Sequence, residues 1–316
     1  MWLIALLGCD FSGAADPNAT NTVVFEVPDG STAGGIGPSL VAEGLVDDET
    51  RWKMWLKQSG EGGCLKAGRF KLSASMSKPE LMEVMCGVPL ADEVPYTVVE
   101  GWRMRDIDAD LAAKGWIEAG EYLAAAKDPS KFEVPIEVAG LSSLEGLLSP
   151  ETYMVPEHDF TVDAFIQRQL DLFAENFDTS KVGERSAYDV VIVASMLERE
   201  EPTPDQRPLV AGIIWKRLDN GWQLGIDATS HYHLEDWNDR KGLLAALKDP
   251  NDLYNTRLRK GLPPTPIGSP SVASLEAAMA PVKSEYWYYL HDKNGVLRPA
   301  RNAAQHEANR AKYNVY

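Results

Sequence analysis

The chain has 316 residues, of which 44% are hydrophobic and 25% are charged, and this composition is typical of a soluble globular protein of about two domains. Its formal net charge is −16, which argues against a nucleic-acid-binding protein, because such a protein would show a basic face, so nucleic acid is not an expected partner. The same charge opposes electrostatic docking on anionic lipid.

Residues 1–22 are predicted to be a targeting segment followed by a disordered tether. The apolar run at residues 2–8 is too short to span a bilayer. It leads into Leu6-Leu7-Gly8-Cys9, which resembles a bacterial lipoprotein signal, and the small polar residues 10–21 suit a spacer. We therefore expect Cys9 to be a lipid anchor, and the alternative is a chance apolar start with a buried cysteine.

Two further cysteines, Cys64 and Cys86, remain for a disulfide if Cys9 carries lipid. An oxidising compartment would allow the bridge, which would contribute roughly 3 kcal/mol in the chain-entropy model. Two separate thiols fit the sequence equally well, so the pairing stays open.

An internal repeat aligns residues 25–47 with residues 96–118 without gaps. Each copy is predicted to be a short strand, a glycine turn and an amphipathic helix that ends at a glycine. This unit resembles LysM-like modules, which bind glycan strands, and we expect such a module at residues 23–92. The identical pairs are Val27/Val98, Gly30/Gly101, Ile36/Ile107, Leu40/Leu111, Ala42/Ala113 and Gly44/Gly115.

The remainder, residues 93–316, is predicted to be a mixed domain, so that the fold class of the chain is α+β. Apolar periodicity and capping residues predict helices at 160–177, 189–201, 206–218, 243–248, 272–280 and 302–313. Short strands are predicted at 223–226 and 286–290.

Three carboxylates end the apolar helix predicted at 189–201, namely Glu198, Glu200 and Glu201. A carboxyl group in an apolar setting keeps its proton and can act as a general acid on a glycosidic bond. Helical periodicity does not choose among the three, and a solvated helix end explains each of them equally well.

Three segments in order carry a family resemblance: Ala194-Ser195-Met196-Leu197-Glu198-Arg199-Glu200, then Tyr254-Asn255-Thr256, then Gly261-Leu262-Pro263-Pro264. Together they resemble the MltG-type (YceG-like) endolytic murein transglycosylases. The resemblance places the catalytic acid on Glu198. It implies a substrate-binding set of Glu200, Gln223, Asp227, Thr229, Tyr232, Tyr254, Asn255, Thr256, Leu262 and Pro263.

The chain departs from this family in two places. Asp227-Ala228-Thr229 stands where many members have Asp-Pro-Thr, and residues 294–299 replace a Gly-Gly-His-x-Phe pattern. The histidine pair His231 and His233 has no third ligand nearby in sequence, so no metal is expected, and the resemblance implies no organic cofactor.

The expected function is cleavage of the MurNAc–GlcNAc bond of peptidoglycan without water, giving 1,6-anhydro-MurNAc ends and limiting the length of nascent strands. The alternatives are a muramidase that uses water and a non-catalytic glycan-binding scaffold of cell-wall synthesis. The expected partners are peptidoglycan glycan strands and cell-wall synthases. The expected location is the outer face of the plasma membrane, facing the periplasm, with the N-terminus as anchor.

Overall fold

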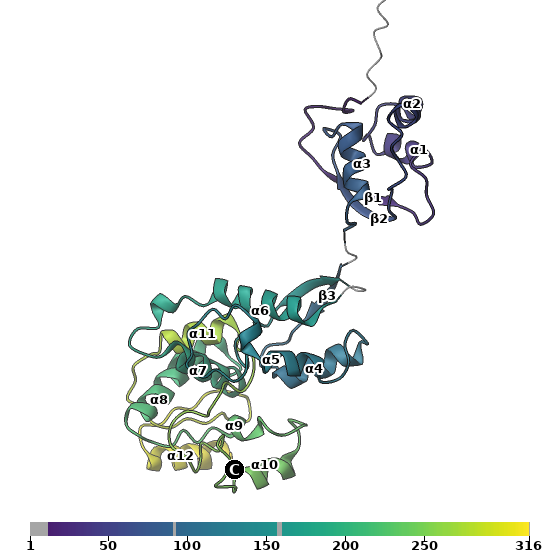
Figure 1. Cartoon of the computed structure of the whole chain (residues 1–316). Coiled ribbons are helices and arrows are strands. Elements are labelled where there is room, and N and C mark those ends of the chain that lie inside the picture. Colours follow the sequence, from purple (N-terminus) through teal and green to yellow (C-terminus); the bar gives the residue numbers. More distant parts are fainter. Residues whose placement is uncertain (1–11, 91–92, 157–159, 316) are drawn as a thin grey trace, which may run out of the picture. The chain divides into compact units, whose positions relative to one another are not determined.

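The computed structural model describes residues 12–90, 93–156 and 160–315 (Figure 1). The chain divides into two compact units. The first takes the described residues up to Glu93 together with Pro156, and the second takes Val94–Val155 and the residues from Phe160 onward. Cys9, the expected lipid anchor, lies outside the described residues. Within the described ranges, no helix is long and apolar enough to cross a membrane.

The first unit consists of a two-stranded antiparallel sheet covered by helices. Phe25 pairs with Phe70 across the sheet, and both side chains are buried because directly opposed residues of an antiparallel pair share one face. The Trp52 indole packs in the same core and donates a hydrogen bond to the carbonyl of Ala33, 2.7 Å away. The elements are β1 (Val23–Val27), α1 (Gly37–Ala42), α2 (Glu49–Ser59), β2 (Gly68–Leu72) and α3 (Lys78–Cys86).

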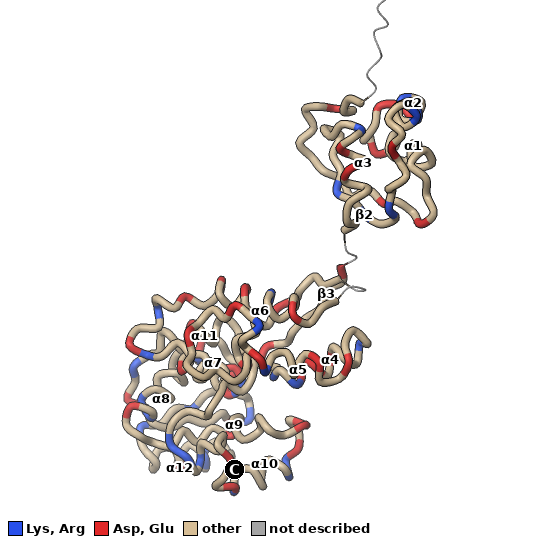
Figure 2. The backbone as a smooth tube through the Cα atoms, in the orientation of Figure 1, with Lys and Arg blue, Asp and Glu red and all other residues tan. Residues whose placement is uncertain are grey.

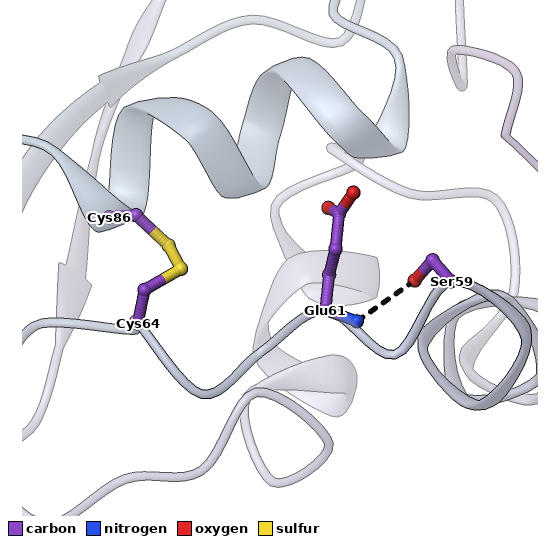
Figure 3. Close-up of a disulfide and its surroundings, with 4 residues drawn as sticks. All are labelled: Ser59, Glu61, Cys64 and Cys86. Atoms are coloured by element: carbon purple, nitrogen blue, oxygen red, sulfur yellow. Dashed lines mark hydrogen bonds between the residues drawn. A yellow bond between two sulfur atoms is a disulfide. The ribbon is translucent and has the colours of Figure 1, made fainter.

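Cys64 and Cys86 form a disulfide that fastens the loop before β2 to the end of α3 (Figure 3). Their Cα atoms are 5.1 Å apart, within the usual range for a disulfide. Next to the bridge, the Lys66 amide donates to the carbonyl of Met85 at 3.1 Å. The structure therefore decides a pairing that the sequence left open.

The second unit is mainly helical, with one small sheet formed by β3 and β4. Helix α7 is its centre, because residues 190–197 are buried on every side and the helix packs against α8 and α11. The α-helices and strands are β3 (Glu93–Thr97), α4 (Met104–Ala113), α5 (Glu121–Ala126), β4 (Thr152–Pro156), α6 (Val162–Asn176), α7 (Ala187–Glu200), α8 (Arg207–Asp219), α9 (Asp227–His231), α10 (Arg240–Ala246), α11 (Val272–Met279) and α12 (Ala303–Tyr313).

The internal repeat of the sequence is a repeat of structure. Each unit begins with the order strand, helix, helix, strand, helix, with a 3-10 turn (Pro129–Lys131) intervening in the second. Gly30 and Gly101 have φ values of 75° and 77°, and Gly44 and Gly115 have 68° and 74°, all in the left-handed region that favours glycine. The likeness of this arrangement to LysM modules stays a prediction.

The second copy of the repeat is built into the unit that contains α7. The Gly101 amide donates to the carbonyl of Ser269 at 2.7 Å, and the Ser269 amide donates to Trp102 at the same distance. A Cβ atom at Gly268 would lie 2.4 Å from the Gly101 carbonyl oxygen, so the two backbones can approach this closely only at a glycine.

The mixed architecture with two small sheets is consistent with the expected α+β class. The strands predicted at 223–226 and 286–290 are wrong, because these segments contribute only isolated bridges, such as Gln223 to Lys260 and Tyr288 to Ala300. The polar segment that continues from residue 226 is not extended either, because Asp227–His231 forms the short helix α9.

Candidate functional site

The carboxylates of interest lie at the C-terminal end of α7. Ser186 caps the start of the helix by accepting a hydrogen bond from the Asp189 amide, and Pro202 follows its end. Near that end, the Ser195 hydroxyl donates to Ile192 O and accepts from the amide of Ile267 at 3.0 Å. This contact fixes α7 to the segment that leads into α11.

Glu198 lies in a buried network in which its two oxygens accept five hydrogen bonds. Arg207 donates to both oxygens at 3.1 and 3.0 Å, and the Ser274 hydroxyl donates at 2.9 Å. The amide and hydroxyl of Ser271 complete the set, so that the carboxylate caps the N-terminus of α11. Only 6% of the Glu198 side chain is exposed. Such a carboxylate is well suited to hold α7, α8 and α11 together.

Glu200 instead lines a cavity of about 700 Å³ beside the end of α7, and Glu198 does not. The lining comes from α7, α8, α9, α12 and the segments between them: Glu200, Arg217, Trp222, Gln223, Gly225, Asp227, Arg257, Tyr288, Tyr289, Leu290, His291, His306, Arg310 and Val315. A concave site of this size with a few convergent polar groups is the form that small-molecule and sugar sites take.

The environment of Glu200 favours its protonated form. Burial raises the pKa of Glu200 above its ordinary value of 4.5, and the nearby Asp227 carboxylate raises it further. His291, the Tyr289 hydroxyl and Arg217 act in the opposite direction. A carboxyl group with a raised pKa at the wall of a cavity has the properties of a general acid.

The cavity is rich in arginine although the whole chain is acidic. Three arginines line it, against two carboxylates. Figure 2 shows Lys and Arg in α8 and α12, where Arg217 and Arg310 lie in the last turn of their helices. A ligand that carries carboxylates would find favourable charges here.

Two more of the expected substrate-binding residues reach the cavity. Gln223 lines it while its side chain donates to Leu258 O at 3.2 Å. Asp227 lines it and forms a two-pronged ion pair with Arg257. With Glu200, these are the members of the expected set that the structure brings together around one space.

Three others are buried parts of the scaffold. The Thr229 and Thr256 hydroxyls both donate to Ile226 O, at 2.7 and 3.1 Å, which fixes the backbone before α9. The Asn255 amide group is fully used, because it donates to Ala246 and Asp249 and accepts from the amides of Arg257 and Leu258. Asn255 therefore has no free group with which to orient an N-acetyl substituent.

The remaining four pack against the core. Tyr232 stacks on Tyr254 with ring centroids 4.6 Å apart, and its hydroxyl donates to Glu145. Leu262 is half-buried against the core, and Pro263 is buried. Glu145 is buried too, and burial raises its pKa to about 7.

Sequence reasoning missed most of the cavity wall, including Arg217, Trp222 and Tyr289. A usable signal was present in the aromatic run at 286–289, where large side chains precede a polar turn. His291 and His306, which belong to no sequence motif named above, both line the cavity. Within the described part of the chain, no cluster of three potential metal ligands occurs.

Comparisons with known proteins find a matching family and several similar proteins. A family model described as the YceG-like family matches residues 25–312. The chain is similar to the endolytic murein transglycosylase of Bacillus subtilis (strain 168), with 25% identity over 98% of this chain and 89% of that protein. It is also similar to the endolytic murein transglycosylase of Streptococcus pneumoniae serotype 2 (strain D39), with 26% identity over 94% of this chain and 59% of that protein.

A crystal structure of the putative yceG-like protein lmo1499 from Listeria monocytogenes has the same fold. The TM-score is 0.59 at 23% sequence identity, and the match covers 92% of this chain and 99% of that one.

Proposed function

This chain belongs to the YceG-like family, as the three sequence segments indicated, and we propose that it is an endolytic lytic transglycosylase acting on peptidoglycan. The observation that carries the proposal is Glu200, a carboxyl group with a raised pKa that lines a polar cavity. Its curated relatives are named for the same activity. Peptidoglycan strands carry carboxylates on their stem peptides, and on the lactyl groups where the peptide has been removed, which suits the three arginines of the wall.

In the proposed reaction, Glu200 donates its proton to the glycosidic oxygen as the bond from C1 of MurNAc breaks. The C6 hydroxyl of the same sugar then attacks C1, and the Glu200 carboxylate takes the hydroxyl proton. The product is a 1,6-anhydro end, Glu200 is protonated again, and no water is consumed. Neither a metal nor an organic cofactor takes part in these steps.

We assign the acid to Glu200 rather than to Glu198, which the family motif had suggested. Glu198 accepts hydrogen bonds on both oxygens, is almost fully buried and does not line the cavity. Its proposed part is to position the end of α7, and through it Glu200, which lies two residues further on.

A hydrolase of the muramidase type remains the second candidate because a second carboxylate, Asp227, lines the same cavity. Hydrolytic glycosidases use such pairs. Arg257 occupies both oxygens of Asp227, which disfavours Asp227 as a base for water.

Digestion of purified peptidoglycan followed by mass spectrometry of the fragments tests the proposal. Anhydro-terminated fragments throughout would support a transglycosylase, and reducing MurNAc ends as the main product would indicate a hydrolase. Fragments released from strand interiors rather than from strand ends would support endolytic cleavage. No fragments at all would leave the scaffold role that the sequence also allowed.

The proposed location is the cell envelope. The Cys64–Cys86 disulfide supports a compartment outside the reducing cytosol. Anchoring through Cys9, contact with cell-wall synthases and the limiting of strand length are further parts of the proposal, and fatty-acid labelling of wild type and Cys9→Ala tests the first of them.

We also propose that the first unit holds the glycan as a LysM-like module. Its two-stranded sheet with flanking helices and its sequence relation to the second copy support this. Hydrogen exchange on the whole chain, with and without glycan strands, tests it. Protection that appears only in the second unit would contradict a glycan-holding role for the first.

A further inference from the structure

An exposed tryptophan forms part of the wall of the cavity that contains Glu200. Trp222 follows α8 after the turn at Asn220 and Gly221, and its amide donates to Arg217 O at 2.8 Å. Although it lines the cavity, 40% of its surface stays exposed. By contrast, Trp215 of the preceding helix is buried at 5%. A large apolar ring that stays exposed to water does not contribute the free energy of burial, so the position of Trp222 suggests a function other than stabilising the fold.

The Trp222 ring is held in place by other aromatic rings. It packs on Trp287 with centroids 4.5 Å apart and planes inclined by 32°, and it meets the edge of Tyr288 at 5.9 Å. Tyr288 lines the same cavity. These contacts restrict the indole before any ligand arrives, which lowers the entropy cost of binding.

The support beneath this pair is itself anchored. The Lys216 ammonium lies 4.3 Å from the Trp287 ring centre and donates to the carbonyls of Ser284 and Tyr286. Arg217 donates to the carbonyl of Trp287 and to that of Leu224, and so joins the two chain segments that carry the rings.

We propose that Trp222 is a sugar-binding platform, on which one pyranose ring of the glycan strand stacks while the bond next to it lies at Glu200. The inference rests on the proposed function for the identity of the ligand. In a β-linked strand of GlcNAc and MurNAc, the ring hydrogens are axial, so each ring presents an apolar C–H face. An aromatic ring matches that face in shape and polarity, and the polar groups of the cavity remain for the hydroxyl and acyl substituents.

The test compares Trp222→Ala with Trp222→Phe, which keeps an aromatic face, and with Leu253→Ala. Leu253 is an exposed apolar residue, 53% accessible, that does not line the cavity. All variants are first checked for an unchanged melting temperature. Trp222→Ala should raise the KM for purified glycan strands roughly five- to tenfold with a smaller change in kcat. The KM of Trp222→Phe should stay within about threefold of the wild-type value, and the KM of Leu253→Ala should equal the wild-type value.

Binding of a GlcNAc–MurNAc tetrasaccharide without stem peptides, measured by titration calorimetry, separates this inference from the proposed function. If the wild type cleaves strands but KM and tetrasaccharide affinity are unchanged in Trp222→Ala, the platform is refuted and the function stands. If the wild type cleaves nothing yet binds the tetrasaccharide more tightly than Trp222→Ala does, the platform stands and the function fails. An equal loss of tetrasaccharide affinity in Trp222→Phe and Trp222→Ala would also refute stacking, because the phenyl ring should preserve the stacking contact.

Discussion

Exchanging the two glutamates of the motif for glutamine should separate catalysis from stability. Glu200→Gln removes the proton donor, so cleavage should fall by about two to four orders of magnitude. Glu198→Gln leaves Glu200 in place but removes the charge that faces Arg207, so it should mainly destabilise the second unit.

The magnitude for Glu198 follows from its contacts. Breaking a buried ion pair by removing one partner costs about 3–5 kcal/mol, and the amide oxygen of glutamine can still accept some of the five hydrogen bonds. We therefore expect a loss of about 3 kcal/mol. For a unit of this size, that corresponds to a fall in Tm of roughly 6–12 °C.

Glu200→Gln should behave in the opposite way in the same melting experiment. Because the pKa of Glu200 is raised on folding, its ionisation opposes folding once the pH exceeds the ordinary value of 4.5. The neutral variant should thus be at least as stable as wild type at neutral pH, and this advantage should disappear below pH 4.5.

Peptidoglycan release measured below the lower Tm, alongside thermal melts of both variants, provides the assay. Glu198→Gln should keep a substantial fraction of wild-type activity while it is folded. A Glu198→Gln variant that melts like wild type and is inactive, beside an active Glu200→Gln, would refute the reasoning and return the acid to Glu198.

Three further outcomes are expected. Removing the His291 side chain should raise the pKa of Glu200, because the electrostatic influence of His291, which lowers that pKa, is lost. The alkaline limb of the pH–rate profile should then move to higher pH, and an unmoved limb would contradict this. The variant with serine at both Cys64 and Cys86 should lose about 3 kcal/mol of stability, because the disulfide closes a loop between residues 22 positions apart in sequence. Hydrogen exchange of the backbone amides should become faster in β1 and β2 but not in α7. Burial raises the pKa of Glu145 to about 7, so wild type should lose about 3 kcal/mol of unfolding free energy relative to Glu145→Gln as the pH rises from 4.5 to above 7. Urea titrations at a series of pH values measure this, and parallel plots of unfolding free energy against pH for the two proteins would contradict the prediction.

Much of the helical framework could be predicted because its signals are local. Ser77 is the N-cap of α3, where the Glu80 carboxylate accepts from the Ser77 amide at 2.7 Å, and Asn302 caps α12. Thr161 is the N-cap of α6, although its side chain makes no capping bond. The glycines that end α1 and α4 have the same conformation in both copies of the repeat, so the sequence alignment translated directly into structure.

The short strands failed for a physical reason. A segment becomes a strand only when a partner runs beside it for several residues, and the partner is distant in sequence. The backbone pairing between residues 223–226 and residues 256–260 is brief: it consists of the bridge between Gln223 and Lys260 and the hydrogen bond from the Gly225 amide to the Thr256 carbonyl. Alternating polarity alone could not reveal that the contact is so short.

The family motif falls on the last turns of α7, but it could not decide which glutamate faces the cavity. Two residues along an α-helix correspond to a rotation of about 200° about its axis, so Glu198 and Glu200 lie on nearly opposite sides of α7 and must have different neighbours. What Glu198 meets is decided by Arg207, nine residues on, and by Ser271, which is 73 residues away. The surroundings of Glu200 include Asp227 and His291, and both residues are more distant in sequence from α7 than Arg207 is. Charge pairing on one side of the helix and burial beside a cavity on the other give two similar side chains different surroundings, on which their different proposed tasks rest, and only the tertiary fold carries that information.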